Sequence, residues 1–290
     1  MSLLAGVRTA AELVRLSHTV FALPFALMAL LAASRGWPPP AVLGWVLVAM
    51  VGARTTAMAF NRLVDHALDA ANPRTAGRHL PRGVVGRPSV WALAGGGAAL
   101  LVVAAWRLNP LCLALSPLAL GWVLAYSFAK RFTALSHLWL GLSLGLAPTG
   151  AWLAIRGALA APPVALALAV TCWVAGFDVL YALQDEAFDR ARGLHSLPAR
   201  LGAGRAIAVA RTLHALAAAG FAAFALLVGA GPGLWLGVAA AAVLLIWQHL
   251  LVAPQRLERL DTAFFTANGA LSIVMFGLYA LDMMLAAWAP

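Results

Sequence analysis

Long apolar runs separated by short polar segments make up almost all of the 290-residue chain. A membrane-spanning helix needs about 20 mostly apolar residues. Turn-forming residues separate several of the runs, as in Gly36-Trp37-Pro38-Pro39-Pro40 and Asn109-Pro110. The pattern therefore predicts an all-α, polytopic membrane bundle with nine spans, at about 16–34, 41–67, 88–107, 109–128, 136–155, 163–183, 205–229, 232–251 and 262–286.

Composition supports a membrane protein. The chain is 63% hydrophobic and only 10% charged, whereas a soluble domain carries roughly 25% charged residues. The net charge of +10 comes from basic residues in separate segments between apolar runs. That distribution is typical of loops that face the cytoplasm and anionic lipid headgroups. We expect the lipid bilayer, and no nucleic acid, as a partner.

The basic residues also predict an orientation. With nine spans the two termini lie on opposite sides of the membrane. A cytoplasmic N-terminus places 14 of the 20 Lys and Arg residues on the cytoplasmic side and only Arg35, Arg107 and Arg156 on the other. Positively charged loops stay in the cytoplasm. We therefore expect the N-terminus and the polar loops at about 68–87 and 184–204 to be cytoplasmic.

Acidic residues are concentrated in two segments that each follow an apolar run. Six of the ten lie in the first acidic segment, residues 61–78, or the second, residues 178–189. Ionisable residues at membrane depth indicate a functional site. Residues four apart share a helical face, which aligns two sets: Asn61, Asp65 and Asp69, and Tyr181, Asp185 and Asp189. Asp178, two turns before Asp185, is expected on the second face.

Two rows of carboxylates in a low-dielectric site need cations. Oxygen ligands suit Mg²⁺, which commonly bridges carboxylates to substrate phosphates, and the absence of His from the aligned positions disfavours zinc or di-iron. Basic side chains that match phosphate oxygens flank the acids: Arg74, Arg78, Lys130, Arg131 and Arg192. Together these residues predict a diphosphate carrying a hydrocarbon tail. A proton or cation pathway in a transporter is the alternative.

The two acidic segments also resemble each other. Each continues into a basic stretch with a His and a Leu-Pro, His79-Leu80-Pro81 in one and His195-Ser196-Leu197-Pro198 in the other. The resemblance predicts one transmembrane domain over residues 1–290 with two pseudo-repeated halves, roughly 1–130 and 131–290. Chance similarity in so apolar a chain is the other interpretation.

The segments match longer signatures. The first reads Asn61-Arg62-x-x-Asp65-x-x-x-Asp69-x-x-Asn72-Pro73-Arg74-Thr75-Ala76-x-Arg78, and the second Asp178-x-x-Tyr181-x-x-x-Asp185-x-x-x-Asp189. Tyr126-Ser127-x-x-Lys130-Arg131 lies between them. These motifs resemble the paired signatures of the UbiA superfamily of intramembrane aromatic prenyltransferases, and the resemblance extends through most of the chain.

The resemblance implies nine helices around a central cavity, Mg²⁺ as the cofactor and a polyprenyl diphosphate as the donor. It implies that Asp65, Asp69, Asp185 and Asp189 hold the metal ions, with Asn61 in the same site. It implies diphosphate contacts from Arg74, Arg78, Tyr126 and Lys130, to which the charge pattern adds Arg192. Asp178 and Tyr181 are then expected beside the acceptor and the reacting carbon, with Asp185 also in the catalytic group.

Two branches of the superfamily are similar to the flanking residues. The stretch Asn72-Pro73-Arg74-Thr75-Ala76 resembles the bacterial 4-hydroxybenzoate polyprenyltransferases. The stretch from Gly193 to Arg200 also resembles the variant proposed for menaquinone synthesis through futalosine. The implied reaction is prenylation of a ring carbon of 4-hydroxybenzoate or a dihydroxynaphthoate-type acid, in ubiquinone or menaquinone biosynthesis at the bacterial inner membrane.

Overall fold

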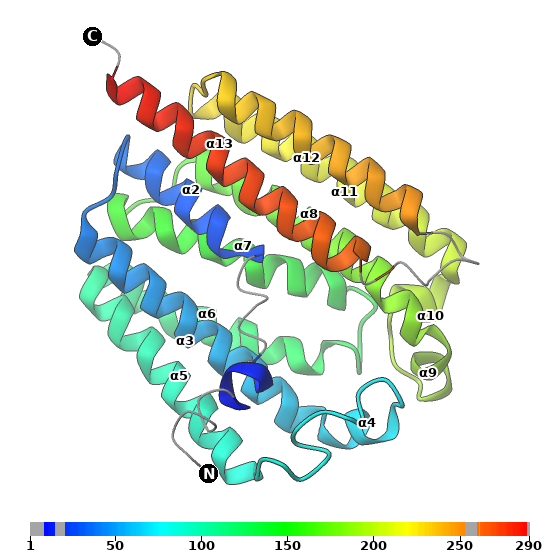
Figure 1. Ribbon diagram of the computed structural model, residues 1–290. Coiled ribbons are helices and arrows are strands. Elements are labelled where there is room, and N and C mark those ends of the chain that lie inside the picture. Colours follow the sequence, from blue (N-terminus) through cyan, green and yellow to red (C-terminus); the bar gives the residue numbers. More distant parts are fainter. Residues whose placement is uncertain (1–8, 15–20, 253–259, 261, 289–290) are drawn as a thin grey trace. The chain divides into compact units, whose positions relative to one another are not determined.

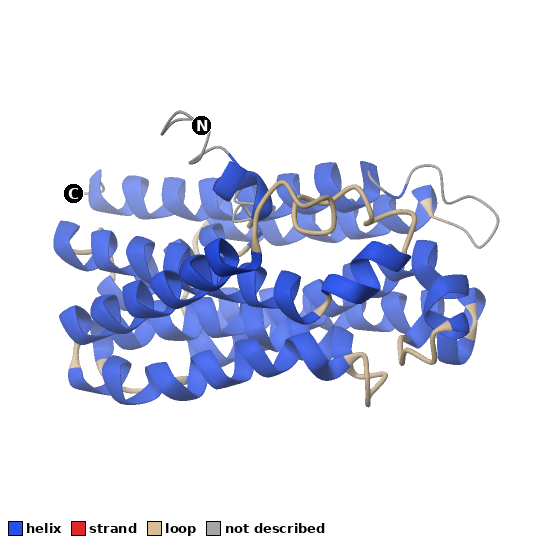
Figure 2. Cartoon of the chain, turned by 90° about the horizontal axis from the view of Figure 1, so that it is seen from below, coloured by secondary structure: helices blue, strands red, loops and turns tan. Residues whose placement is uncertain are grey.

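The computed structural model describes residues 9–14, 21–252, 260 and 262–288. Within these residues every regular element is helical (Figure 2). The long helices are α2 (Leu23–Ser34), α3 (Pro40–Val64), α5 (Arg87–Leu108), α6 (Pro110–Ala129), α7 (Ser136–Arg156), α8 (Ala161–Tyr181), α11 (Ala203–Leu227), α12 (Pro232–Leu251) and α13 (Asn268–Trp288). Short helices are α4 (His66–Ala71), α9 (Glu186–Ala191) and α10 (Leu197–Leu201), with the 3₁₀ turn η2 (Ala182–Asp185) and the π-helical turn η3 (Thr262–Ala267).

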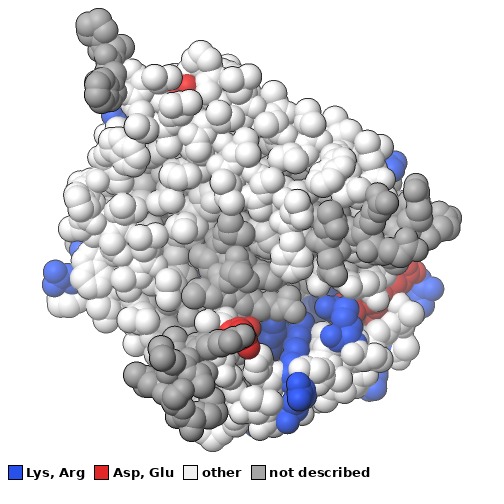
Figure 3. Space-filling model, viewed as in Figure 1, with Lys and Arg blue, Asp and Glu red and all other residues white. Residues whose placement is uncertain are grey.

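The predicted spans correspond in order to these long helices. Eight helices of the described chain are long and apolar enough to cross a membrane, and α2 is a shorter apolar helix. Part of the first predicted span, residues 16–20, lies outside the described residues. Uncharged side chains cover most of the face drawn in Figure 3. The prediction of an all-α, multi-pass membrane protein with about nine spans is confirmed.

The chain forms two compact units. The first contains residues 1–19 and 40–128, and the second contains residues 20–39 and 129–290. The division near residue 129 lies close to the boundary predicted for the two halves. However, α2 belongs to the second unit although it precedes α3 in sequence. The internal duplication itself stays a prediction.

Close packing of small residues joins α3 to α5 in the first unit (Figure 1). A Cβ atom added to Gly52 would lie 2.7 Å from the carbonyl oxygen of Gly97, and one on Gly97 would meet Thr56 equally closely. The Thr56 hydroxyl donates a hydrogen bond to the Ala94 carbonyl across the same interface (3.0 Å). Small residues allow membrane helices to approach closely, and that approach strengthens their van der Waals contact.

Helix α8 packs between α7 and α11 in the second unit (Figure 1). Gly141 of α7 lies against the backbone of Thr171, and Gly220 of α11 lies against Ala169. Near the middle of α8 lies Trp173, whose indole N–H donates to Asn268 Oδ1 of α13 (2.9 Å). Buried packing on several sides therefore fixes the helix that leads into the second acidic segment.

Candidate active site

The first acidic segment begins where α3 ends. Asp65 leaves the α-helical conformation at φ −93° and ψ 8°, and α4 follows it. The helix that corresponds to the second predicted span, at about 41–67, ends at Val64. The hydrogen-bond register nevertheless continues, because Asp65 N–H donates to the Asn61 carbonyl (2.9 Å) and Asp69 N–H donates to the Asp65 carbonyl (2.7 Å). The Asn61 amide also donates to Asp65 Oδ2 (2.8 Å). Asn61 and Asp65 therefore share a face as predicted.

Asp69 is the buried acid of this segment, with 7% of its surface exposed. Arg78 Nη1 lies 2.6 Å from Asp69 Oδ1, and Arg62 Nη1 lies 3.7 Å from Oδ2. The chain folds back over Asp69 because Thr75 Oγ1 donates to the Asp69 carbonyl (3.0 Å). Two arginines thus balance a carboxylate that would be strongly destabilised if buried alone. The sequence predicted the proximity of Arg78 but not the role of Arg62.

The remaining residues predicted in the first unit lie on or near its surface. Arg74 is exposed, and its backbone N–H is held by Asn72 Oδ1 (3.0 Å) in a local turn. Tyr126 is half-buried in the last turn of α6. The structure places both in the same unit as Asp65 and Asp69, and their contacts with a diphosphate stay a prediction.

The second acidic segment repeats the local geometry of the first. Asp185 has φ −101° and ψ 2° and precedes the six-residue helix α9, just as Asp65 precedes the six-residue helix α4. The fourth residue of each short helix is a buried acid, Asp69 in one and Asp189 in the other. Asp65 and Asp185, and likewise Asp69 and Asp189, thus occupy equivalent local positions.

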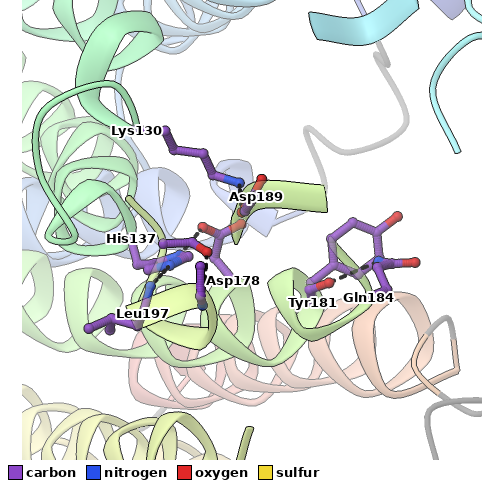
Figure 4. A network of polar contacts seen from close by, with 9 residues as sticks. Lys130, His137, Asp178, Tyr181, Gln184, Asp189 and Leu197 are labelled. Carbon is purple, nitrogen blue, oxygen red and sulfur yellow. Dashed lines mark hydrogen bonds and ion pairs between the residues drawn. The ribbon is translucent and has the colours of Figure 1, made fainter. Parts of the chain in front are cut away.

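The helical geometry changes within the second acidic segment, where the sequence analysis used regular α-helical spacing. The 3₁₀ turn η2 separates α8 from α9. Since a 3₁₀ turn is wound more tightly than an α-helix, the seven-residue spacing of Asp178 and Asp185 no longer equals two α-helical turns. At the break, the Gln184 side-chain amide donates to the Tyr181 carbonyl (2.9 Å; Figure 4).

Asp189 is the most buried acid of the second segment, with 2% of its surface exposed. Lys130 Nζ lies 3.4 Å from Asp189 Oδ2 (Figure 4). The Lys130 backbone is also held, because His195 N–H donates to its carbonyl oxygen (2.7 Å). Arg192 is exposed at the end of α9, with its guanidinium carbon 5.7 Å from the centre of the Phe188 ring. Lys130 therefore contacts Asp189 directly, whereas the exposed Arg192 lies over Phe188.

Asp178 and Tyr181 lie in the last turns of α8. Asp178 Oδ2 is 2.7 Å from His137 Nδ1 of α7, and His137 Nε2 is 3.3 Å from the Leu197 backbone nitrogen (Figure 4). The Tyr181 ring packs against Phe264, with centroids 4.3 Å apart. His137 was missed from the sequence. A histidine beside Ser136 at the start of an apolar run gives no local indication of a partner 41 residues away.

The sequence and the fold are similar to those of known proteins. The model of the UbiA prenyltransferase family matches residues 22–276. The chain belongs to the UbiA prenyltransferase family. It is 31% identical over 260 residues to the 4-hydroxybenzoate octaprenyltransferase of Alkalilimnicola ehrlichii, covering 87% of this chain and 86% of that one. It is 32% identical over 259 residues to the Aeromonas salmonicida enzyme of the same name, covering 87% of each.

Solved structures of UbiA homologues share the fold. The apo structure of a homologue from Aeropyrum pernix K1 has a TM-score of 0.85 and 36% identity, covering 92% of this chain and 98% of that one. A homologue from Archaeoglobus fulgidus bound to DMAPP and Mg²⁺ has a TM-score of 0.72 and 19% identity, covering 96% of this chain and 99% of that one. The resemblance to the UbiA superfamily is confirmed, and this chain is an enzyme of the prenyl-transfer class.

The acidic residues of this UbiA protein fit a hard divalent cation. Asp69 Oδ2 is buried and has no hydrogen-bond partner among the described residues. Among the described residues, no group of three His, Cys, Asp or Glu side chains could hold a metal ion by itself. The unpartnered oxygen of Asp69 is a ligand of the type that Mg²⁺ takes, together with water and substrate phosphate oxygens.

Proposed function

We propose that this protein transfers a polyprenyl group from polyprenyl diphosphate to a ring carbon of a hydroxylated aromatic acid, in a Mg²⁺-dependent reaction. The repeated Asp geometry of the two acidic segments, within a chain of the UbiA family, carries the proposal. The names of the relatives support 4-hydroxybenzoate as acceptor. The stretch from Gly193 to Arg200 supports a dihydroxynaphthoate as the other candidate. Family membership favours the enzyme over the transporter.

In this proposal the acids of both segments hold Mg²⁺, and nearby amide, phenol and basic groups hold the diphosphate. Bound Mg²⁺ would neutralise charge on the diphosphate as it leaves. The proposed metal ligands are Asp65, Asp69, Asp185 and Asp189. The proposed diphosphate contacts are Asn61, Arg74, Arg78, Tyr126, Lys130 and Arg192. Structures of the UbiA homologue from Archaeoglobus fulgidus bound to DMAPP and Mg²⁺, and to GPP and Mg²⁺, support this assignment.

The chemistry follows from the leaving group. The allylic C–O bond breaks and its electron pair departs with the diphosphate, which leaves a delocalised allylic cation. The electron-rich ring of the acceptor forms the new C–C bond, and the ring then loses one proton. Asp178 and Tyr181 are proposed beside the acceptor and the reacting carbon, and Asp185 completes the catalytic group. An apolar surrounding excludes water, which would otherwise capture the cation.

We place the protein in the bacterial inner membrane with the N-terminus and both acidic segments on the cytoplasmic side. The distribution of basic residues supports this orientation. The aromatic acid would then reach the site from the cytoplasm, while the donor would lie with its diphosphate headgroup at the cytoplasmic side and its prenyl chain in the bilayer.

The decisive experiment uses membranes containing the protein, Mg²⁺, radiolabelled octaprenyl diphosphate, and either 4-hydroxybenzoate or a dihydroxynaphthoate. A radiolabelled, prenylated acid that forms only with Mg²⁺ is expected, and the faster acceptor identifies the branch. The absence of product with both acids would refute the proposed reaction. Cation flux abolished by Asp65→Asn, together with that absence, would favour the transporter.

A further inference from the structure

His137 connects two parts of the second unit through opposite sides of its ring. The residue lies in the first turn of α7, and its side chain is about as buried as any in the structure, with 1% exposed. One ring nitrogen contacts the carboxylate of Asp178, and the other contacts the backbone of Leu197, where α10 begins (Figure 4). A buried imidazole with both nitrogens engaged is fixed in orientation.

The two partners determine where the imidazole proton lies. A backbone N–H can only donate, so His137 Nε2 accepts from Leu197 (3.3 Å). In a neutral ring the proton must then be on Nδ1, which donates to Asp178 Oδ2 (2.7 Å). This donation fixes the rotamer of the Asp178 carboxylate.

The segment around Leu197 is itself firmly held. Ser196 is fully buried and caps α10 by accepting a hydrogen bond from the Ala199 N–H (3.3 Å). One residue earlier, His195 N–H donates to the carbonyl of Lys130. The contact between His137 and Leu197 therefore ties the ring to a loop whose position is set independently. That loop also holds the backbone of the lysine that reaches Asp189.

We propose that His137 is a positioning residue for prenyl transfer. Its ring holds the Asp178 side chain in one orientation and leaves Asp178 Oδ1 directed to the acceptor. The Asp178 side chain is 19% exposed, so a substrate can reach it, whereas His137 cannot touch the substrate itself. This inference rests on the proposed function, because it assigns His137 a task only if Asp178 acts on an acceptor.

A purely structural role is the competing explanation, in which His137 serves only to anchor Leu197 and α10. Two substitutions separate the roles. The Asn amide ends two bonds beyond Cβ, as Nδ1 does, so His137→Asn can still donate to Asp178. The Gln amide ends three bonds beyond Cβ, as Nε2 does, so His137→Gln can still accept from Leu197 but loses the donor to Asp178.

The test measures kcat and KM of both variants in the prenylation assay. We expect His137→Asn to keep kcat within several-fold of the wild type. We expect His137→Gln to lose roughly 100-fold in kcat, the effect of a small misplacement of a catalytic group. The KM for polyprenyl diphosphate should stay unchanged in both. A His137→Gln variant as active as His137→Asn, or more active, overturns the inference in favour of the structural role.

His214→Asn is the matched control. His214 is another buried histidine of the second unit, and its Nδ1 lies 3.0 Å from His249 Nε2. In the described part of the chain, no hydrogen bond joins it to a proposed site residue. Its substitution reports the general effect of replacing a buried histidine in the bundle. The control is expected to retain kcat below its melting temperature. A loss of kcat equal to that of His137→Gln would overturn the specific role of His137.

A readout independent of turnover is ¹⁵N NMR of histidine-labelled protein in lipid nanodiscs. The His137 signals are assigned by their absence from either His137 variant. A protonated Nδ1 and an unprotonated Nε2 are expected, and the opposite tautomer overturns the inference.

A wild-type protein that prenylates no acceptor refutes the proposed function and the task of His137 with it. An active wild type with the reverse order of variants refutes the His137 inference alone.

Discussion

Lys130 and Asp189 form an ion pair across 59 residues of sequence, with Nζ and Oδ2 separated by 3.4 Å. The lysine side chain is one-third exposed, whereas the aspartate side chain is almost fully buried, with 3% exposed. The cation therefore neutralises a buried acid and still has a side open to a ligand. A diphosphate bound to Mg²⁺ on Asp189 would lie within reach of the same ammonium group.

Replacing Lys130 should weaken donor binding. Lys130→Met removes the ammonium and leaves Asp189 without this partner. We expect the KM for polyprenyl diphosphate to rise roughly tenfold, equivalent to about 1.4 kcal/mol of binding free energy. Arg190→Met is the control, because Arg190 pairs with Glu186 on the surface (2.8 Å). An unchanged KM in Lys130→Met, measured in the same assay, would remove Lys130 from the diphosphate site.

Removing one carboxylate from either acidic segment should abolish turnover. Asp65→Ala and Asp185→Ala are each expected to lower kcat by at least 100-fold, which is typical when one charge-stabilising group is lost. Membrane fractionation and size-exclusion chromatography should show normal insertion. Glu186→Gln is the control, because this acid adjoins Asp185 but pairs with Arg190. Near-normal activity in either alanine variant contradicts the metal assignment.

Chelation should stop the reaction reversibly. EDTA is expected to abolish prenyl transfer, since the proposed carboxylate ligands would then repel the diphosphate. Added Mg²⁺ should restore activity, and added KCl of equal ionic strength should not, because monovalent salt screens charge without bridging carboxylate to phosphate. The measurement is product formation in washed membranes. Full activity after exhaustive chelation would show that the acids work without a divalent metal.

The sequence predicted what depends on spacing within one helix. The lengths of apolar runs gave the spans, and the four-residue spacing of Asn61 and Asp65 gave a shared face that their hydrogen bond confirms. The helix breaks at Asp65 and Asp185 were missed because neither position is marked by Gly or Pro. Contacts between helices, such as His137 with Asp178, depend on how α7 packs against α8. No local pattern encodes that packing.

The carboxylate of Asp282 should anchor α12 to α13. Its two oxygens accept the backbone N–H groups of Gly233 and Leu234, each at 2.7 Å, in the first turn of α12. Asp282→Ala leaves both buried donors without this acceptor, and we expect a loss of about 1–3 kcal/mol of stability. Asp282→Asn keeps one acceptor oxygen, so its stability should lie between those of the wild type and Asp282→Ala. Thermal unfolding in detergent micelles measures the three melting temperatures. Equal melting temperatures for all three proteins would contradict the prediction.

Helices α7 and α8 lie so close at Gly141 and Thr171 that no side chain fits at position 141. A Cβ atom at position 141 would collide with the Thr171 carbonyl oxygen and lie 3.0–3.1 Å from its carbonyl carbon and Cα. These are backbone atoms, so no side-chain rotation relieves the overlap. The two helices must separate, and overpacking of this kind destabilises proteins by about 1–3 kcal/mol. Gly141→Ala should therefore lower the melting temperature in detergent micelles.

Gly150→Ala supplies the matched comparison for Gly141→Ala within the same helix. Nothing lies within 4 Å of a Cβ atom added at Gly150. Alanine there should leave stability unchanged or raise it slightly, because alanine is favoured over glycine inside helices by roughly 0.5–1 kcal/mol. The separation of α7 from α8 should also displace His137 from Asp178, so Gly141→Ala should lose kcat as well. If Gly141→Ala and Gly150→Ala have equal melting temperatures and equal kcat, close packing at Gly141 does not position the site.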